Sequence, residues 1–250
     1  MVEPHPVDRL FETSKIVEPY PDGVLPILKR IPGLAFFPGG YGLWGKTMHQ
    51  PPPAFPIGGV MVVGHNFDCE KGYNRSFEAR TERSTSPTWG PLSKVILNAG
   101  IKLERCFFTN AYMGLKAGDK AQGKFPGSLD SAFVKRCSAF LLHQIREQRP
   151  NLVLVLGLEA VQIVASISQD LDMWRQVTSL EDIYRLDRQG RSPVVSAFFE
   201  GMDHNVKVAL LVHPCNRHVN AKGRSFGSIK GPSAEVAILK ELRDTINWKN

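Results

Sequence analysis

The sequence predicts an α/β protein with three layers, α/β/α, in which helices cover both faces of a central parallel sheet of four strands. Four short apolar runs are typical of strands that are buried on both faces. Segments with the apolar spacing of amphipathic helices lie between these runs and after the last one. Because strands that alternate with helices pair in parallel, the order of the elements predicts this architecture.

The first 56 residues are predicted to be an irregular arm that packs on the main domain. They are rich in Pro, Gly and aromatic residues and have no regular apolar period, so we expect at most one short helix there. The three prolines at residues 51–53 are typical of an extended hinge. The chain is therefore divided into an arm, residues 1–56, and an α/β domain, residues 57–250.

The four predicted strands lie at residues 58–64, 105–110, 152–156 and 206–212. The first and third read GGVMVVG and LVLVL, and each is an apolar run that ends at a glycine. The second and fourth read RCFFTN and VKVALLV. Such runs suit strands without a solvent-facing side.

Helices are predicted at residues 91–99, 131–148, 160–167 and 232–248. The first has a proline in its first turn and Gly100 after its end, as helices prefer. The second is the most strongly patterned, because five apolar residues share one face: Phe133, Cys137, Phe140, Leu141 and Ile145.

Two segments show no such pattern. Residues 69–86 are long and charged and are predicted to be a loop. Residues 168–205 are polar and mixed, and we expect a loop excursion with a small hairpin.

The composition indicates a globular protein and gives only a weak signal about its partner. Hydrophobic residues make up 42% of the chain, which is enough for a core. The net charge of +7 and the pI near 9.3 weakly favour nucleic acid as a partner. We expect a monomer in a prokaryotic cytoplasm or on the DNA, since the first residues lack the apolar stretch of a secretion signal and no apolar run approaches a membrane span of about 20 residues.

The ends of the predicted strands carry polar groups. The first strand is followed by His65, Asn66 and Asp68, and the second ends in Asn110. The fourth runs into His213-Pro-Cys-Asn-Arg-His218. Ligands bind beyond the carboxyl ends of the strands in such sheets, so these groups are predicted to share a pocket.

Several kinds of site are disfavoured. There is no GxGxxG or GxxxxGK[ST] after the first strand, and no GxSxG. His213, Cys215 and His218 could be metal ligands, but they crowd one short turn and no fourth ligand is evident. The four cysteines show no CxxC spacing and are expected to be reduced thiols. We therefore expect no metal and no cofactor.

The order and spacing of these strand ends resemble the uracil-DNA glycosylase superfamily, over roughly residues 57–247. Gly64-His65-Asn66 resembles the first motif, Gly-x-Asn-Pro-Gly, of the single-strand-selective monofunctional uracil glycosylases and the mismatch thymine/uracil glycosylases. HPCNRHVNAKG, residues 213–223, resembles the second motif of the single-strand-selective enzymes, His-Pro-x-x-Arg followed by an Asn-Lys-Gly stretch. Residues 109–110 and 152–160 resemble the middle strands of that fold.

The resemblance implies three catalytic residues. Asn66 would position the attacking water, and Asp68 would act as general base or stabilise the sugar cation. His213 would donate a hydrogen bond to a carbonyl of the departing base. The chain has Phe67-Asp68 where the family has Pro-Gly, and the iron–sulfur cysteines of some branches are not matched. The first departure puts uracil itself in doubt as the substrate.

The resemblance also implies residues that bind DNA. Asn110 would read the edge of a pyrimidine, Phe77 would stack on the flipped base, and His65 would line the pocket or shape the strand end. Arg217 would enter the duplex or bind a phosphate. A basic loop would follow the DNA backbone with Lys222, Arg224 and Lys230.

Three functions compete. The first is a DNA glycosylase that flips out a pyrimidine and leaves an abasic site. The base would be uracil or a 5-modified pyrimidine, such as modified cytosine in viral DNA, and the role would be repair or antiviral defence. No lysine nucleophile for a lyase is evident at a strand end, which predicts a monofunctional enzyme. The second is a catalytically silent DNA-binding relative, and the third is a small-molecule nucleoside hydrolase.

Overall fold

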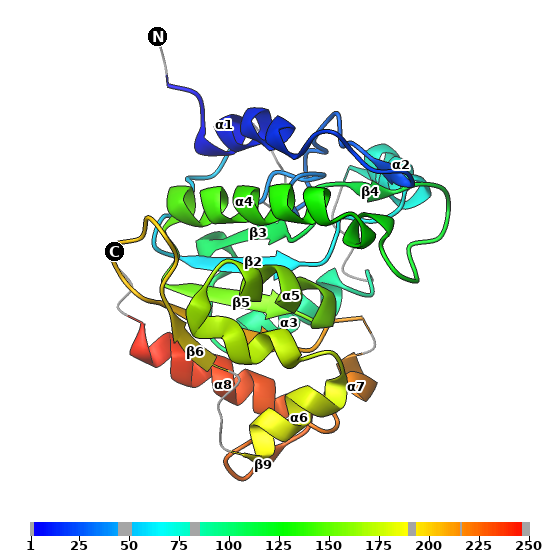
Figure 1. The fold of residues 1–250 in the computed structure, drawn as a ribbon. Coiled ribbons are helices and arrows are strands. Elements are labelled where there is room, and N and C mark those ends of the chain that lie inside the picture. The colour runs from blue at the N-terminus through cyan, green and yellow to red at the C-terminus, as the bar shows by residue number, and fades with distance from the viewer. Residues whose placement is uncertain (1–2, 45–51, 81–85, 190–193, 216, 247–250) are drawn as a thin grey trace.

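The computed structural model describes residues 3–44, 52–80, 86–189, 194–215 and 217–246 (Figure 1). Parts of the predicted hinge, of the loop at residues 69–86 and of the last helix lie outside these ranges. The described part of the chain holds a central five-stranded sheet with helices on both faces. None of its helices is long and apolar enough to cross a membrane.

The central sheet has the strand order β3-β2-β5-β7-β6. Its four parallel strands are β2 (Val60–Gly64), β3 (Cys106–Asn110), β5 (Leu152–Leu156) and β7 (Val206–Leu211). They confirm the predicted parallel strands. A fifth strand, β6 (Val194–Ala197), was not predicted in this sheet and pairs antiparallel with β7 at its edge.

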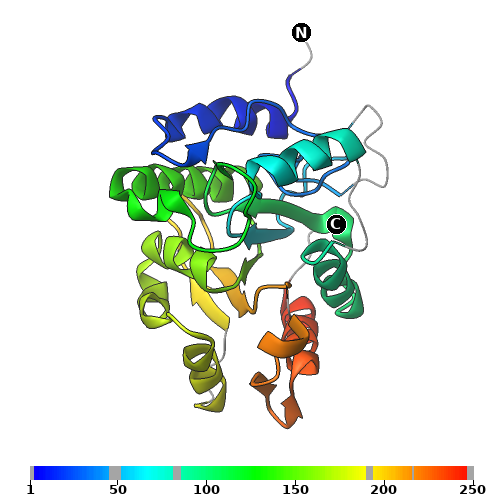
Figure 2. The ribbon, with the colours of Figure 1, turned by 90° about the vertical axis from the view of Figure 1, so that its right-hand side faces the viewer.

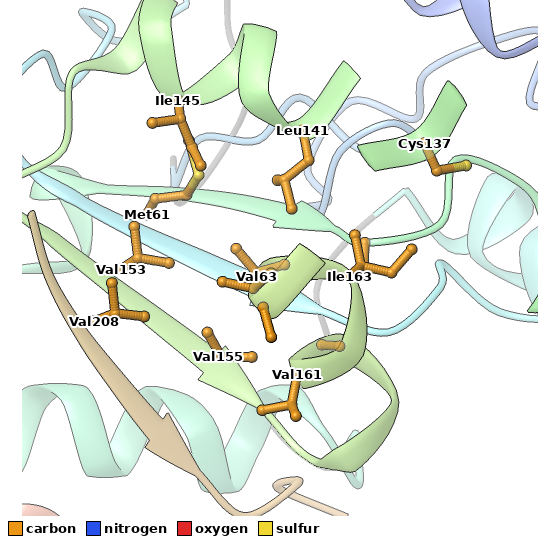
Figure 3. Packing of buried hydrophobic residues seen from close by; sticks show 14 of the residues in the cluster. Met61, Val63, Cys137, Leu141, Ile145, Val153, Val155, Val161, Ile163 and Val208 are labelled. Carbon is orange, nitrogen blue, oxygen red and sulfur yellow. The ribbon is translucent and has the colours of Figure 1, made fainter. Parts of the chain in front are cut away.

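Alternate residues of the strands point to opposite faces, and each face is covered by helices. Met61, Val63 and Val153 pack under α4 (Ser131–Gln148) and α5 (Leu158–Ser166), as Figure 3 shows. Residues between them in sequence, such as Val62 and Leu154, face α3 (Trp89–Asn98) and α8 (Pro232–Thr245). Burial of each such Val or Leu contributes about 1.5–3 kcal/mol, so the two apolar layers hold the sheet rigidly.

The N-terminal residues cover the outer edge of β3. The first 25 residues contain α1 (Pro6–Thr13), the 3-10 helix η1 (Ser14–Val17) and β1 (Val24–Leu25), and Val7 and Leu10 belong to the same core as α4. Further along, Phe37 N donates to Phe108 O at 3.0 Å and Phe108 N donates to Gly42 O at 2.8 Å. These bonds satisfy backbone groups that an open edge would expose. The division at residue 56 remains a prediction.

Two predicted loops contain helices. The charged segment after β2 forms α2 (Glu70–Ala79), whose only fully buried residue is Gly72, so it left no apolar period in the sequence. The excursion after α5 forms η4 (Gln169–Gln176) and α6 (Leu180–Arg188) before β6. α6 begins at a capping box in which Ser179 and Asp182 bond each other's backbone N–H groups.

The remaining elements are short. β4 (Leu115–Lys116) pairs with β1, and β8 (Ser225–Phe226) forms a hairpin with β9 (Ile229–Lys230). η2 (Leu103–Arg105) precedes β3, η3 (Pro126–Leu129) precedes α4, and α7 (Arg217–Asn220) follows β7.

Candidate active site

The carboxyl ends of the four parallel strands form one rim, on the side from which Figure 2 is viewed. The pairing of β2 and β3 continues past the strands: Ala111 N donates to Gly64 O at 2.8 Å and Tyr112 N donates to His65 O at 2.9 Å. On the other side of β2, the sheet continues through β5 to β7, which His213 follows. The rim therefore holds the segments after β2, β3, β5 and β7 in a fixed order.

His213 carries its proton on one defined nitrogen. The backbone N–H of Cys215 donates to its Nδ1 at 3.2 Å, so Nδ1 is an acceptor and the proton of the neutral ring lies on Nε2. Burial of the side chain lowers the pKa of His213 below 6.5 and favours this neutral form. His213 is therefore a neutral hydrogen-bond donor through Nε2.

His65 is a second neutral imidazole on the rim. Burial, followed by the influence of His213, lowers its pKa to about 4. Its ring stands edge-on to those of Tyr112, at 5.3 Å, and Phe125, at 5.8 Å between centroids. Its buried Nε2 has no hydrogen-bond partner among the described residues and lies 3.9 Å from Oε2 of Glu159. His65 thus lines an aromatic wall of the rim.

Asn66 and Asp68 are held in one tight turn. Nδ2 of Asn66 donates to the carbonyl of Asp68 at 3.0 Å, and Oδ1 of Asp68 accepts from Cys69 N at 2.7 Å. The Asp68 carboxylate lies against the backbone of α2, where a Cβ added at Gly72 would come within 2.1 Å of Oδ2. Both side chains are half-buried. The turn therefore orients an amide and a carboxylate within three residues of His65.

The sequence match decides the family. The model of the uracil DNA glycosylase superfamily matches residues 62–243, from β2 to α8, and so spans the whole rim. The chain belongs to the uracil-DNA glycosylase superfamily. Membership indicates DNA glycosylase activity on uracil-like bases. No curated protein matches the chain.

Asn110 ends β3 at the rim of this glycosylase, and its amide is bonded within the protein. Its side chain is buried, with 2% of the residue exposed, and Nδ2 donates to the carbonyl of Phe37 at 2.9 Å. Oδ1 lies beneath Gly64, where an added Cβ would come within 2.6 Å of it. Asn110 therefore ties the N-terminal residues to the strand ends, and its role in reading a base remains a prediction.

The aromatic residues on the rim of this glycosylase differ from the predicted one. Phe77 is half-exposed on α2, and its ring contacts are with Tyr73, at 6.3 Å, and with the guanidinium of Arg80, at 5.8 Å. Its stacking role stays a prediction. Tyr112 and Phe125, which pack on His65, were missed. Tyr112 could have been found as the second residue after β3, whereas Phe125 lies in a stretch without any pattern.

Two of the four predicted DNA-binding residues form ion pairs with carboxylates of the protein itself. Arg224 is 1% exposed and binds Asp187 and Glu235, so it cannot reach a phosphate, and its predicted role is wrong. Arg217 is largely buried and donates to Glu235 and to Pro232 O, so the structure does not support a side chain free to enter a duplex. Lys222 and Lys230 are exposed, and their role remains a prediction.

Two acidic residues near the glycosylase rim were also missed. Glu159 follows β5, is half-exposed and faces His65. Glu235 lies on α8, 1% exposed, and accepts from Val212 N directly before His213. Glu159 could have been found from its place as the third residue after β5. Nothing in the sequence indicates the role of Glu235, because its hydrogen-bond partners lie far away along the chain.

A hollow of about 570 Å³ adjoins the segment that follows His213. It lies between α3 and α8, and Lys94, Pro214, Arg217 and His218 are among the residues that line it. Of these residues only Lys94 and Arg217 carry a fixed positive charge, and Arg217 is already paired with Glu235.

Proposed function

We propose that the chain is a monofunctional DNA glycosylase, which flips a pyrimidine out of DNA and hydrolyses its N-glycosidic bond to leave an abasic site. The observation that carries this proposal is the tautomer of His213, in which Nε2 carries an N–H rather than a lone pair. A donor at that position suits a leaving base that gains negative charge.

The reaction follows from the charges that develop. As the bond between C1′ and the base nitrogen lengthens, its electron pair moves onto the base, and the sugar becomes an oxocarbenium-like cation. Nε2–H of His213 donates to the base carbonyl where this charge collects. The low pKa of His213 makes it a donor that stays neutral and gives up no proton, so the base leaves as an anion.

The turn after β2 supplies the other half of the reaction. Water adds to C1′ on the face opposite the base, and its proton passes to a carboxylate. Asp68 is the carboxylate beside Asn66, whose amide would orient this water. A negative charge at Asp68 would also stabilise the sugar cation.

Hydrolysis without strand cleavage is the expected outcome. A lyase needs an amine that attacks C1′, and the segments after the four parallel strands, residues 65–68, 111–114, 157–160 and 212–215, contain no lysine. The product is therefore an abasic site with an intact backbone, which hot alkali converts to a break.

The base is uracil or a pyrimidine with a substituent at C5, modified cytosine of viral DNA included. Phe67-Asp68 stands where the family has Pro-Gly, and the segment that follows is the charged helix α2. A changed first motif favours a changed base, which would place the enzyme in defence rather than repair.

The test is a single-turnover assay on matched oligonucleotides, single- and double-stranded, that carry uracil, 5-hydroxymethyluracil, 5-hydroxymethylcytosine or its glucosylated form. Alkali-labile breaks at the modified base, absent with unmodified DNA and with Asn66→Ala, are the expected result. Tight binding to abasic DNA without release of any base would instead identify a silent DNA-binding relative. Release from free nucleosides alone would identify a nucleoside hydrolase.

A further inference from the structure

Among the described residues, side chains bond the end of β7 on one of its two sides. Leu211 O accepts from Gly157 N at 2.8 Å, so the backbone groups of Leu211 point toward β5. The backbone groups of its neighbours Leu210 and Val212 therefore point to the opposite side of β7. On that side the last pair between β7 and the described part of β6 is Ala209 with Val194. Beyond it, Leu210 O accepts from Nη1 of Arg224 at 3.0 Å, and Val212 N donates to Oε1 of Glu235 at 2.7 Å.

Glu235 and Arg224 act here as one unit. Oε1 of Glu235 also accepts from Nη1 of Arg224 at 3.2 Å, so an acceptor and a donor that are bonded to each other satisfy one N–H and one C=O of the strand. Both side chains are fully enclosed, with 1% and 0% exposure. Apolar residues at these positions would leave two buried backbone groups without partners, which is costly.

The same carboxylate reaches past His213. Oε2 of Glu235 accepts from Nε of Arg217 at 2.9 Å, and Arg217 begins α7. Glu235 therefore binds the residue directly before His213 and a residue shortly after it. Asp187 of α6 completes the network by accepting from Nε of Arg224 at 2.9 Å. Two carboxylates thus balance two guanidinium groups in the interior, as buried charges require.

We propose that Glu235 is a positioning residue for His213. By binding both flanks of the turn, Glu235 holds the turn in which Cys215 N donates to Nδ1 of His213. This inference rests on the proposed function for its effect on rate, whereas its effect on the conformation of His213 can be measured without any substrate.

The first experiment compares Glu235→Gln with Gln148→Ala. The amide that replaces the Glu235 carboxylate keeps an oxygen for Val212 N but turns an N–H₂ group toward an arginine. Gln148 is the matched control: it is fully buried, and its Nε2 donates to Pro56 O at 2.6 Å, at the opposite end of the sheet. We expect Glu235→Gln to lower the single-turnover rate at saturating DNA by about 10–100-fold, as loss of an orienting partner does, with affinity for abasic DNA kept within about threefold. Gln148→Ala should keep the rate within about twofold at comparable loss of stability.

The second experiment is independent of catalysis. In free wild-type protein, ¹⁵N NMR of His213 should show the tautomer with the proton on Nε2, and Glu235→Gln should shift it toward a mixture of tautomers. The amides of Leu210, Val212 and Arg217 should also exchange faster in this variant, by about tenfold or more, while those of β2 remain protected.

These outcomes separate the two proposals. If the wild type releases no base, the proposed function fails, and the NMR and exchange measurements still decide the role of Glu235. A folded Glu235→Gln variant with an unchanged His213 tautomer overturns the positioning role. An equal loss of rate in Gln148→Ala also overturns it, because the effect would then follow from stability alone.

Discussion

Gly157 lies directly against His213: a Cβ added at Gly157 would come within 2.9 Å of the Cβ of His213. Gly157 also has a φ of +79°, which favours glycine. The glycine that directly follows β5 therefore leaves room for the backbone and Cβ of His213 after β7, and the two strand ends are packed against each other.

Gly157→Ala is expected to displace His213. Strain at positive φ costs about 1–2 kcal/mol, and the contact with His213 adds to it. Gly118→Ala is the matched control, because Gly118 has a φ of +82° and an added Cβ there meets no atom within 4 Å. Urea unfolding and single-turnover assays should show a lower rate of base release for Gly157→Ala only. Equal rates in the two variants would contradict a functional contact.

His213→Ala should abolish most of the activity while the fold stays intact. Loss of one hydrogen-bond donor to a developing negative charge typically costs about 100- to 1,000-fold in rate. The exposed His218, in the same motif, serves as control, and its substitution by alanine should leave the rate within about twofold of wild type. A His213→Ala enzyme with wild-type rate would show that another group stabilises the departing base.

The substitution Asp68→Asn separates the proposed catalytic role of Asp68 from its structural role. The asparagine keeps an oxygen for Cys69 N, so the free energy of unfolding should change by less than about 0.5 kcal/mol. The rate should fall by about 100-fold or more, because an amide neither accepts a proton nor stabilises a cation by charge. Asp130→Asn is the control, since Asp130 accepts from Phe133 N at the start of α4 in the same way. Unchanged base release in Asp68→Asn would leave Asp68 as a structural cap.

The two buried histidines should make stability depend on pH. The pKa of His65 is lowered to about 4 and that of His213 is also lowered, while histidine in an unfolded chain titrates near 6.5. The unfolded state therefore binds more protons between these values, so the stabilisation is complete above about pH 6.5 and is lost as the pH falls toward 4. His65 accounts for at most about 3 kcal/mol of this loss.

Urea unfolding at several pH values tests this dependence. His65→Phe keeps an aromatic ring between Tyr112 and Phe125 and removes one titrating group, so its free energy of unfolding should fall less steeply below pH 6.5. A slope as steep as that of the wild type would show that other groups cause the acid sensitivity.

Lys222 and Lys230 are expected to bind DNA phosphates. Substitution of either by glutamine should weaken binding to all sequences and reduce the slope of log affinity against log salt by about 1. Lys102, exposed just before β3 at the opposite end of the sheet, is the control. Fluorescence anisotropy over a salt series measures both quantities. An equal change in Lys102→Gln would indicate a general effect of net charge.

The sequence by itself determined the parallel sheet and the position of its rim. Apolar runs such as residues 152–156 are buried on both faces, and this burial leaves a pattern that local reading detects. The rim residues His65, Asn66 and His213 follow such runs directly, so their places could also be predicted. The charged helix α2 could not be predicted, because Gly72 is its only buried residue and its apolar residues show no periodic pattern.

Only the tertiary structure decided which polar side chains face the rim and which support it. Asn110 and Arg224 look like binding residues in the sequence, yet one bonds Phe37 O and the other bonds Asp187 and Glu235 in the interior. Glu235 shows no signal at all, although it binds Val212 N beside His213. The reason is physical. The role of a polar residue depends on the donors and acceptors around it, and these come from segments far apart in the chain. The burial of an apolar strand, in contrast, can be predicted from the residues of that strand alone.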